Sequence, residues 1–435
     1  MTGEPANRHD LPASREAYRE ACRHIPGGVN SPVRAFGAVG GHPVFIEKGI
    51  GAWVTDLDGR KYIDYVASYG PLILGHAHPT VEAAVMAAAT RGLSFGAPTI
   101  GETDLARRVT SAFRSIEKVR FVNSGTEAAL SAIRLARGVT GRQGLVKFAG
   151  CYHGHVDALL SAAGSGAAGL DSDSVRGESS STSVLPFNNP EAVRETFRNR
   201  GGEIAALIVE PIPCNMGVVP PREGFLELLR EVTEEAGALL IFDEVITGFR
   251  VGPAGAQGLF DIDPDITLLG KVIGGGMPVG AYGGRAEILD RLAPQGDVYQ
   301  AGTLSGNPVA MAAGKATLDE VSADGFFDRL EETASALADR LASVFQEAGW
   351  PAVIHRVGSL IGLFFTQGEV KDFEEARAAS GDRYAEFFNQ MLERGVYLAP
   401  SPMEAIFISS AHGQEEIEKT TEAARESCAA ASSDS

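Results

Sequence analysis

A short strand-to-helix segment contains groups that could bind a phosphate. Residues 121–127 run from apolar positions into small polar ones and then into a helical pattern. Gly125 and Thr126 offer backbone N–H groups and a hydroxyl at the positive end of that helix, where an anion is stabilised. Ser124 and Glu127 also have the spacing of a capping box, which would explain both residues without a ligand. The segment alone leaves phosphate binding and helix capping open.

An acid and a lysine follow two other apolar runs. Asp243 comes directly after residues 238–242, and Lys271 comes after residues 266–269 and one glycine. The carboxyl ends of parallel strands form the ligand-binding edge of an open sheet, although Asp243 and Glu244 could instead cap the next helix. Burial lowers the pKa of a lysine, which makes it a nucleophilic amine suited to Schiff-base chemistry.

These three groups together match the needs of one cofactor, pyridoxal 5'-phosphate. Its phosphate needs an anchor, its pyridine nitrogen needs a carboxylate that keeps it protonated, and its aldehyde is held by a lysine as an imine. The helix start near Gly125, Asp243 and Lys271 supply these groups in turn. The combination predicts a pyridoxal-phosphate enzyme more strongly than any one motif does.

Eight sequence blocks carry a resemblance to a known family. From about Ser14 to Glu426 the chain resembles the class III, fold type I aminotransferases, and within them their glutamate-1-semialdehyde aminomutase branch. The blocks are GGVNSPVRAF (27–36), GPLILGHAHP (70–79), NSGTEA (123–128), GCYHGH (150–155), NMGVVPP (215–221), FDEVITGFR (242–250), GKVIGGGMPVGAYGG (270–284) and YQAGTLSGNP (299–308).

The resemblance implies roles for individual cofactor-binding residues. Lys271 corresponds to the lysine that holds the aldehyde and shuttles protons as general acid and base, and Asp243 to the partner of the pyridinium nitrogen. In the family, Thr303 belongs to an element that reaches the phosphate from the neighbouring subunit, which implies a homodimer with shared sites. The remaining cofactor positions are Ser124, Gly125 and Thr126 at the phosphate, Val245 beneath the ring, and Tyr152 stacked on it with His153 beside it.

The resemblance also implies a substrate pocket. Arg34 corresponds to the anchor of the substrate carboxylate, since a guanidinium can bind it through two hydrogen bonds. Without the surrounding block, Arg34 would be interpreted as a surface residue. Tyr69 stands where the aminomutases have tryptophan, and Ile406 where they have glycine. The other implied substrate residues are Ser31, Asn215 and Glu404.

The implied reaction is an intramolecular amino exchange on a small amino-aldehyde. Glutamate-1-semialdehyde would become 5-aminolevulinate, an early step of tetrapyrrole biosynthesis, while the cofactor alternates between pyridoxal and pyridoxamine 5'-phosphate. The alternative within the family is a class III ω- or β-amino acid aminotransferase, which needs a separate amino acceptor. A nucleotide-binding α/β protein that uses the glycines at 274–276 is a rival from another class, but no strand–GxGxxG–helix unit supports it.

The elements that must position these residues form an α/β fold. At 435 residues the chain is too long for one core, and apolar runs alternate with helical patterns between about 80 and 310, which predicts a mostly parallel sheet. A hairpin is expected across Asp58-Gly59, and a long amphipathic helix after 315. We expect an N-terminal segment that contributes to a small α+β domain (1–73), a large cofactor-binding domain (74–315), and the rest of the small domain (316–435). We also expect a disordered tail from Ala429 to Ser435.

Composition excludes several other function classes. The net charge of −18 argues against a nucleic-acid partner, and no stretch is apolar enough for a membrane span. The opening residues resemble no signal or transit peptide, and the four cysteines lie far apart, which favours a reducing, cytoplasmic location. Two HxH pairs, at 76–78 and 153–155, lack further ligands at a useful spacing, so we expect no metal.

One long segment has the composition of a lid. Residues 161–183 are small and polar without periodicity, and they begin six residues after His155. Such a stretch within a compact domain is either functional or a surface insertion. It falls where the family has its gating loop, and an intramolecular exchange needs a closed site that retains its intermediate.

Overall fold

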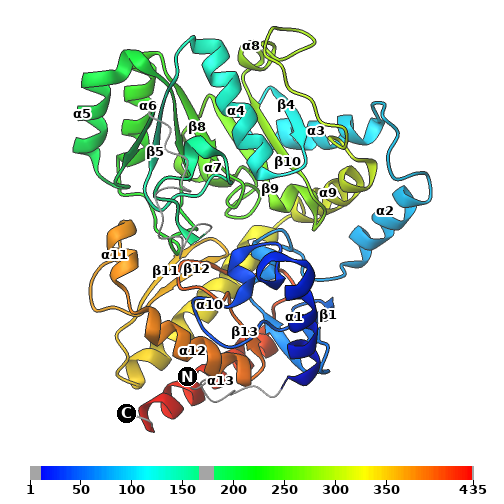
Figure 1. Ribbon diagram of the computed structural model, residues 1–435, viewed down its shortest axis with the longest axis vertical. Helices are drawn as coiled ribbons and strands as arrows, with labels where there is room; N and C mark the ends of the chain where they lie inside the picture. Colours follow the sequence, from blue (N-terminus) through cyan, green and yellow to red (C-terminus); the bar gives the residue numbers. More distant parts are fainter. Residues whose placement is uncertain (1–10, 166–180, 434–435) are drawn as a thin grey trace.

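The computed structural model describes residues 11–165 and 181–433, and its largest element is a seven-stranded sheet (Figure 1). In spatial order its strands are β4 (Lys118–Val122), β10 (Gly280–Gly284), β9 (Ile266–Gly270), β8 (Leu239–Asp243), β7 (Ile204–Val209), β5 (Gly144–Phe148) and β6 (Thr182–Leu185). From β9 to β6 all neighbours are parallel, whereas β10 is antiparallel to β4 and β9. The expected mostly parallel sheet is therefore confirmed.

Helices cover both faces of this sheet, which explains why its strands are apolar throughout. Along β7, Ala206 and Ile208 join the hydrophobic cluster under α4 (Gly125–Thr140). Leu207 and Val209 point the other way, into the cluster formed with α5 (Pro190–Arg200) and α6 (Phe225–Ala236). Because the strands are fixed from both sides, the residues at their ends are held in place. The other helices of this part are α2 (Pro79–Ala89), α3 (Ile100–Ala112), α7 (Gly255–Phe260), α8 (Ala286–Leu289) and α9 (Pro308–Val321).

Two smaller sheets lie in the lower half of Figure 1. One contains β1 (Ile46–Ile50), β2 (Trp53–Asp56), β3 (Lys61–Asp64) and β13 (Val396–Tyr397), and the other β11 (Val353–Val357), β12 (Leu360–Phe364) and β14 (Ile406–Phe407). The antiparallel pair β2–β3 confirms the hairpin across Asp58-Gly59. Val396 pairs in parallel with Ile63, so segments from the two parts of the chain share one sheet.

The remaining helices pack around these sheets. They are α1 (Pro12–His24), α10 (Phe326–Glu347), α11 (Phe373–Ala378), α12 (Gly381–Glu393) and α13 (Gln414–Ser433). The expected amphipathic helix after 315 is α10, whose Leu330, Leu337 and Leu341 are buried. The expectation of a disordered tail from Ala429 is wrong as far as Ser433, because α13 continues to that residue through a run of alanines, the residue with the highest helix propensity. Residues 434–435 lie outside the described residues.

The strand pairing supports the domain division that the sequence indicates. We propose that 74–315 forms the cofactor domain and that 1–73 and 316–435 together build the small domain, as far as these ranges are described. Most of the expected lid is not covered, since 166–180 lies outside the described residues. Among the described residues, none of the helices combines the length and apolar composition that crossing a bilayer requires.

Candidate active site

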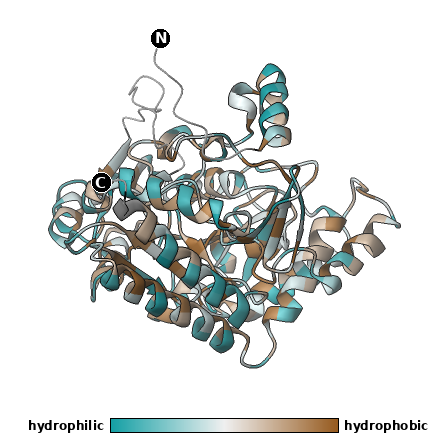
Figure 2. Ribbon diagram, turned by 90° about the horizontal axis from the view of Figure 1, so that it is seen from below, coloured by the Kyte–Doolittle hydropathy of each residue, from teal (hydrophilic) through white to brown (hydrophobic). Residues whose placement is uncertain are grey.

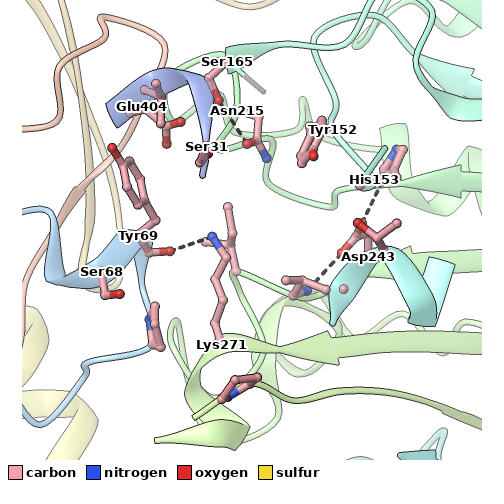
Figure 3. A pocket seen from close by; sticks show the side chains of 18 of the residues that line it. Ser31, Ser68, Tyr69, Tyr152, His153, Ser165, Asn215, Asp243, Lys271 and Glu404 are labelled. Atoms are coloured by element: carbon pink, nitrogen blue, oxygen red, sulfur yellow. Dashed lines mark hydrogen bonds and ion pairs between the residues drawn. The ribbon is translucent and has the colours of Figure 1, made fainter. Parts of the chain in front are cut away.

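A pocket of about 470 Å³ opens at the carboxyl ends of the parallel strands. It is lined from both parts of the chain, by Arg34 and Tyr69 on one side and by the ends of β8 and β9 on the other. Figure 3 shows Lys271 between Tyr69 and Asp243. Two expected site residues, Ser124 and Thr303, are not part of its lining. The expected site residues that line it are Ser31, Arg34, Tyr69, Gly125, Thr126, Tyr152, His153, Asn215, Asp243, Val245, Lys271 and Glu404.

Lys271 follows β9 directly and points into this pocket. Its Nζ donates a hydrogen bond to the carbonyl oxygen of Tyr69 at 2.6 Å and lies 5.9 Å from the ring centroid of Phe407. Burial lowers the pKa of Lys271, partly opposed by nearby acids, of which Glu404 contributes most. The residue has φ +47°, a left-handed conformation that side chains other than glycine rarely adopt. A strained, desolvated lysine at a strand end is characteristic of a functional amine.

The Tyr69 carbonyl is presented by a second strained segment. Ala67, Ser68 and Tyr69 have φ values of 45°, 57° and 64°, three consecutive left-handed residues that are not glycine. Asp64 Oδ1 accepts hydrogen bonds from the N–H groups of Val66 (2.8 Å) and Ala67 (3.2 Å), which fixes the start of this turn. The end of the turn is fixed by the buried Arg250, which donates to the Gly70 carbonyl. This strain persists because the surrounding structure holds it.

Asp243 ends β8 and faces the pocket opposite Tyr69. Its Oδ2 accepts a hydrogen bond from His153 Nδ1 at 2.8 Å, and its Oδ1 accepts one from the Val245 N–H at 3.1 Å. His153 is 1% exposed, and its pKa is lowered by this burial, although Asp243 opposes the shift. Its Nε2 has no hydrogen-bond partner among the described residues. The next acid, Glu244, is buried and accepts hydrogen bonds from Thr247 and from the N–H groups of Ala256 and Gln257 at the start of α7. Helix capping therefore accounts for Glu244 but not for Asp243.

The start of α4 forms the floor of the pocket near Asp243. Ser124 is its N-cap, and its Oγ accepts a hydrogen bond from the Glu127 N–H at 3.1 Å. The capping box is incomplete, because the Glu127 carboxylate returns to the N–H of Asn123 (2.8 Å) and not to that of Ser124. A side chain at position 125 would place its Cβ 3.3 Å from Val245 Cγ2, so glycine lets the helix start approach Val245. The N–H groups at this helix end remain available to an anion.

A buried glutamate that the sequence analysis missed organises the far wall. Glu210 follows β7, is 3% exposed, and accepts hydrogen bonds from the N–H of Tyr152 (2.7 Å) and the N–H of Cys214 (3.0 Å). Asn215 Nδ2 donates to both of its oxygens at 3.0 Å, and Asn215 Oδ1 accepts from Ser165 Oγ at 3.1 Å. Burial raises the pKa of Glu210 to about 8. The sequence carries a signal for Glu210, since this acid follows an apolar run as Asp243 does.

The opposite wall carries groups suited to a charged substrate. Arg34, in the short 3-10 helix η2 (Pro32–Ala35), is exposed and forms no ion pair with a described residue. Glu404 lines the pocket beside Tyr69, and burial raises its pKa against the opposing effects of Ser165 and Lys271. Burial likewise raises the pKa of the Tyr69 hydroxyl. Ile406, the unusual residue two positions later, lies buried in β14 and not in the pocket.

Three of the four histidines in the two HxH pairs have separate side-chain partners, whereas the buried Nδ1 of His78 has no hydrogen-bond partner among the described residues. His76 Nε2 lies 2.6 Å from Asp64 Oδ2, His153 contacts Asp243, and His155 Nδ1 lies 3.3 Å from Thr126 Oγ1. Within the described ranges, no group of three or more His, Cys, Asp or Glu residues is arranged to hold a metal ion.

Of the two expected cofactor residues outside the pocket lining, Ser124 is adjacent to the lining residue Gly125, whereas Thr303 lies elsewhere. Thr303 is exposed and lines a separate hollow together with residues 94–98 and Glu102.

Comparisons with known proteins agree with this geometry. The family model for Aminotransferase class-III matches residues 36–423. Over 419 residues the chain is 57% identical to a glutamate-1-semialdehyde 2,1-aminomutase of Pelotomaculum thermopropionicum, which covers 95% of this chain and 96% of that protein. It is 55% identical over 414 residues to glutamate-1-semialdehyde 2,1-aminomutase 2 of Brevibacillus brevis, covering 94% of this chain and 96% of the relative.

Solved structures show the same architecture. An omega-transaminase from Sphaerobacter thermophilus superposes with a TM-score of 0.89 at 32% identity, covering 98% of this chain and 99% of that one. A glutamate-1-semialdehyde-aminomutase from Pseudomonas aeruginosa superposes with a TM-score of 0.86 at 29% identity, covering 96% and 94%. A match over nearly the whole chain, with the lysine, the acid and the helix start around one pocket, places this protein in the class III aminotransferase family.

Proposed function

We propose that this protein converts glutamate-1-semialdehyde to 5-aminolevulinate by intramolecular amino exchange. The observation that carries the proposal is the placement of Lys271. Its desolvated amine lies between an acid fixed by a buried imidazole, Asp243, and a wall that presents Arg34 and Glu404. Relatives at 54–57% identity over about 95% of the chain have this activity in their names, and this chain has the pocket to support it.

The residues present fit pyridoxal 5'-phosphate. Glycine at position 125 keeps the helix start open where a Cβ would press on Val245, which leaves N–H donors for a phosphate. Asp243 receives hydrogen bonds only from an imidazole and a backbone N–H among the described residues, so it can also accept one from a pyridinium nitrogen. When bound, the cofactor supplies an electron sink that stabilises negative charge on the substrate carbon.

The chain's own residues then bind, orient and move protons. Burial lowers the pKa of Lys271, and this favours an amine that accepts a proton from the substrate carbon and returns it at another carbon. Arg34 binds the substrate carboxylate from the open side of the pocket, with Ser31 beside it. Glu404 and Asn215 line the part of the pocket where the substrate amino groups would bind, and Tyr152 would cover the cofactor ring.

The alternative, an ω- or β-amino acid aminotransferase, is favoured by the TM-score of 0.89 with the omega-transaminase. Steady-state kinetics separates the two functions. An aminomutase converts glutamate-1-semialdehyde completely when no amino acceptor is added, whereas a transaminase stops after one turnover per site. We expect sustained formation of 5-aminolevulinate from the semialdehyde alone. A strict requirement for a keto acid would refute the proposal.

We further propose that two copies form a dimer with shared sites. Helix α2 projects from the right side of Figure 1 and is mainly apolar in Figure 2. Met86 is 63% exposed, Leu93 68% and Ile100 72%, and Leu304 is exposed beside Thr303. An apolar surface of this kind fits a protein interface, and a second copy would bring Thr303 to the neighbouring phosphate.

Light scattering tests the dimer directly. We expect twice the chain mass for the unmodified protein and a shift to the single-chain mass for Ile100→Asp, with loss of bound cofactor. A protein that is monomeric and fully active would contradict the shared site. We also propose a cytoplasmic location, which the wide spacing of the four cysteines in the sequence fits, and cell fractionation checks it.

A further inference from the structure

A buried lysine outside the pocket contacts the loop that carries Tyr152 and His153. Lys147 lies in β5, and its side chain has no exposed surface. By the alternation of a strand, it shares the sheet face of Leu145, which packs in the cluster under α4. Its Nζ donates hydrogen bonds to three backbone carbonyls, those of Cys151 at 3.1 Å, Leu159 at 2.8 Å and Ser161 at 2.8 Å.

These contacts supply hydrogen-bond partners both for the buried ammonium group and for the loop carbonyls. An ammonium group has three donors and no acceptor, so three carbonyls use its full capacity. A buried ammonium is costly unless it is fully hydrogen-bonded, and irregular backbone needs donors for its carbonyls. The carbonyls come from both ends of residues 151–161, and the Gly150 N–H closes the base of the loop on the Ala162 carbonyl at 2.8 Å. Lys147 therefore joins the two ends of this loop.

The other contacts of the loop lead to the pocket. Tyr152 donates its N–H to Glu210 at 2.7 Å, and His153 Nδ1 donates to Asp243 at 2.8 Å. Lys147 thus binds the loop on the side away from the pocket lining, while Glu210 and Asp243 bind it on the pocket side. Burial lowers the pKa of Lys147 to about 8, with Cys151 and Glu210 opposing the shift.

We propose that Lys147 is a positioning residue of the reaction, which fixes loop 151–161 so that Tyr152 and His153 meet the cofactor ring and Asp243. Lys147 itself lies outside the lining of the pocket and acts only through the loop. We call the three hydrogen bonds from Lys147 to the loop the Lys147 clamp. Its expected effect on turnover rests on the proposed function, but the clamp itself needs no ligand.

The same strand offers a matched control at its other end. Arg142 precedes β5, and its Nη1 donates to the carbonyls of Gly201 (3.4 Å), Ile204 (3.2 Å) and Ala236 (2.7 Å). Arg142 is thus a second cation that donates to three backbone carbonyls, but neither Arg142 nor its three partners line the pocket. Lys147→Met and Arg142→Met each remove a charge and its three hydrogen bonds while retaining the apolar stem.

Two measurements on the full-length protein separate positioning from general stability. The first is amide hydrogen exchange, read separately for peptides covering 150–162 and 201–204. The second is the visible circular dichroism of added pyridoxal 5'-phosphate, which reports how the ring is held. We expect Lys147→Met to speed exchange in 150–162 by at least about tenfold, since charged hydrogen bonds are lost. We also expect it to change the dichroism and lower kcat. Arg142→Met should speed exchange only in 201–204 and leave the dichroism unchanged.

Each outcome decides for or against the clamp. If Lys147→Met leaves exchange and dichroism unchanged, or if Arg142→Met alters the dichroism equally, Lys147 has no positioning role. If Lys147→Met does not fold, Lys147→Gln, which keeps two donors, is measured in the same way and must show a smaller change of the same kind. If the unmodified protein binds no pyridoxal 5'-phosphate, the proposed function fails, while the exchange measurement still tests the clamp.

Discussion

The two ends of the large sheet bury acids in different ways. At the amino end of β9, Asp265 is 4% exposed and pairs with two guanidinium groups, Arg230 at 2.9 Å and Arg285 at 3.1 Å. It also accepts a hydrogen bond from the Leu240 N–H at 2.7 Å. At the carboxyl end, Asp243 and Glu210 are equally buried, but neither has a lysine or arginine partner among the described residues.

This difference distinguishes a structural acid from a functional one. A buried carboxylate with its own cations is already neutralised and has little to offer a ligand. Asp243, held by a buried imidazole and one N–H, keeps its charge available to a positively charged ring nitrogen. The cations differ in the same way, because Arg34 in the pocket has no acidic partner among the described residues, whereas Arg230 and Arg285 both pair with Asp265. Unneutralised charge, more than burial, indicates where the chemistry occurs.

The largest expected effect comes from removing the amine at the carboxyl end. Lys271→Ala should lower turnover by at least about 100-fold, the contribution of a positioned acid or base. Borohydride reduction of the unmodified protein, followed by peptide mass spectrometry, should place the phosphopyridoxyl group on this residue. Lys118, at the opposite end of the sheet and paired with Asp290, provides the control, and Lys118→Ala should retain activity. A label on any other lysine would contradict the assignment.

Paired substitutions of the two aspartates test the comparison itself. Asp243→Asn should lower turnover by about 10- to 150-fold, because it weakens a charged hydrogen bond to the ring nitrogen, with little change in the free energy of unfolding. Asp265→Asn should do the opposite. It leaves two guanidinium groups without their acid, so the free energy of unfolding should fall by about 1–3 kcal/mol while turnover per folded molecule is unchanged. Urea unfolding and steady-state kinetics on both variants measure this, and an equal loss of stability in both would remove the distinction.

A smaller effect, on substrate binding, is expected when Arg34 is replaced. Arg34→Lys keeps the charge but loses the two-pronged hydrogen bond, so KM for the semialdehyde should rise about tenfold with kcat nearly unchanged. Cofactor absorbance should be unaffected. Arg285→Lys, at the paired end, is the matched control and should leave KM at its original value. If both variants behave alike, Arg34 is only a surface residue.

The smallest effect is visible only as a function of pH. Burial raises the folded-state pKa of Glu210 to about 8. The folded protein therefore holds a proton that the unfolded chain has released, so this stability is full at low pH and is lost as pH rises through about 8. Glu210→Gln cannot ionise, so its melting temperature should fall less than that of the unmodified protein between about pH 6 and pH 9. Parallel curves for the two proteins would show that Glu210 is already ionised at the lower pH.

Much of the fold could be predicted because its signals are local. The apolar runs at β7, β8 and β9 indicated buried parallel strands, and the turn residues Asp58-Gly59 indicated the hairpin. The rule that placed Asp243 at the ligand-binding edge would also have found Glu210 at the end of β7, had it been applied there. Lys147 gave no such signal, because a single lysine within an apolar strand does not reveal which carbonyls it contacts.

The sequence by itself determined which strands form, which of them end in an acid or a lysine, and which family the motifs resemble, since each depends on residues close together in the chain. Only the tertiary structure decided which buried charges are neutralised. Asp265 meets Arg285, and Lys271 meets the carbonyl of Tyr69, 202 positions away, in a turn whose left-handed residues no local preference would favour. Such contacts exist only once distant segments pack together and exclude water, because only then do burial and strain raise or lower a pKa and fix a reactive group.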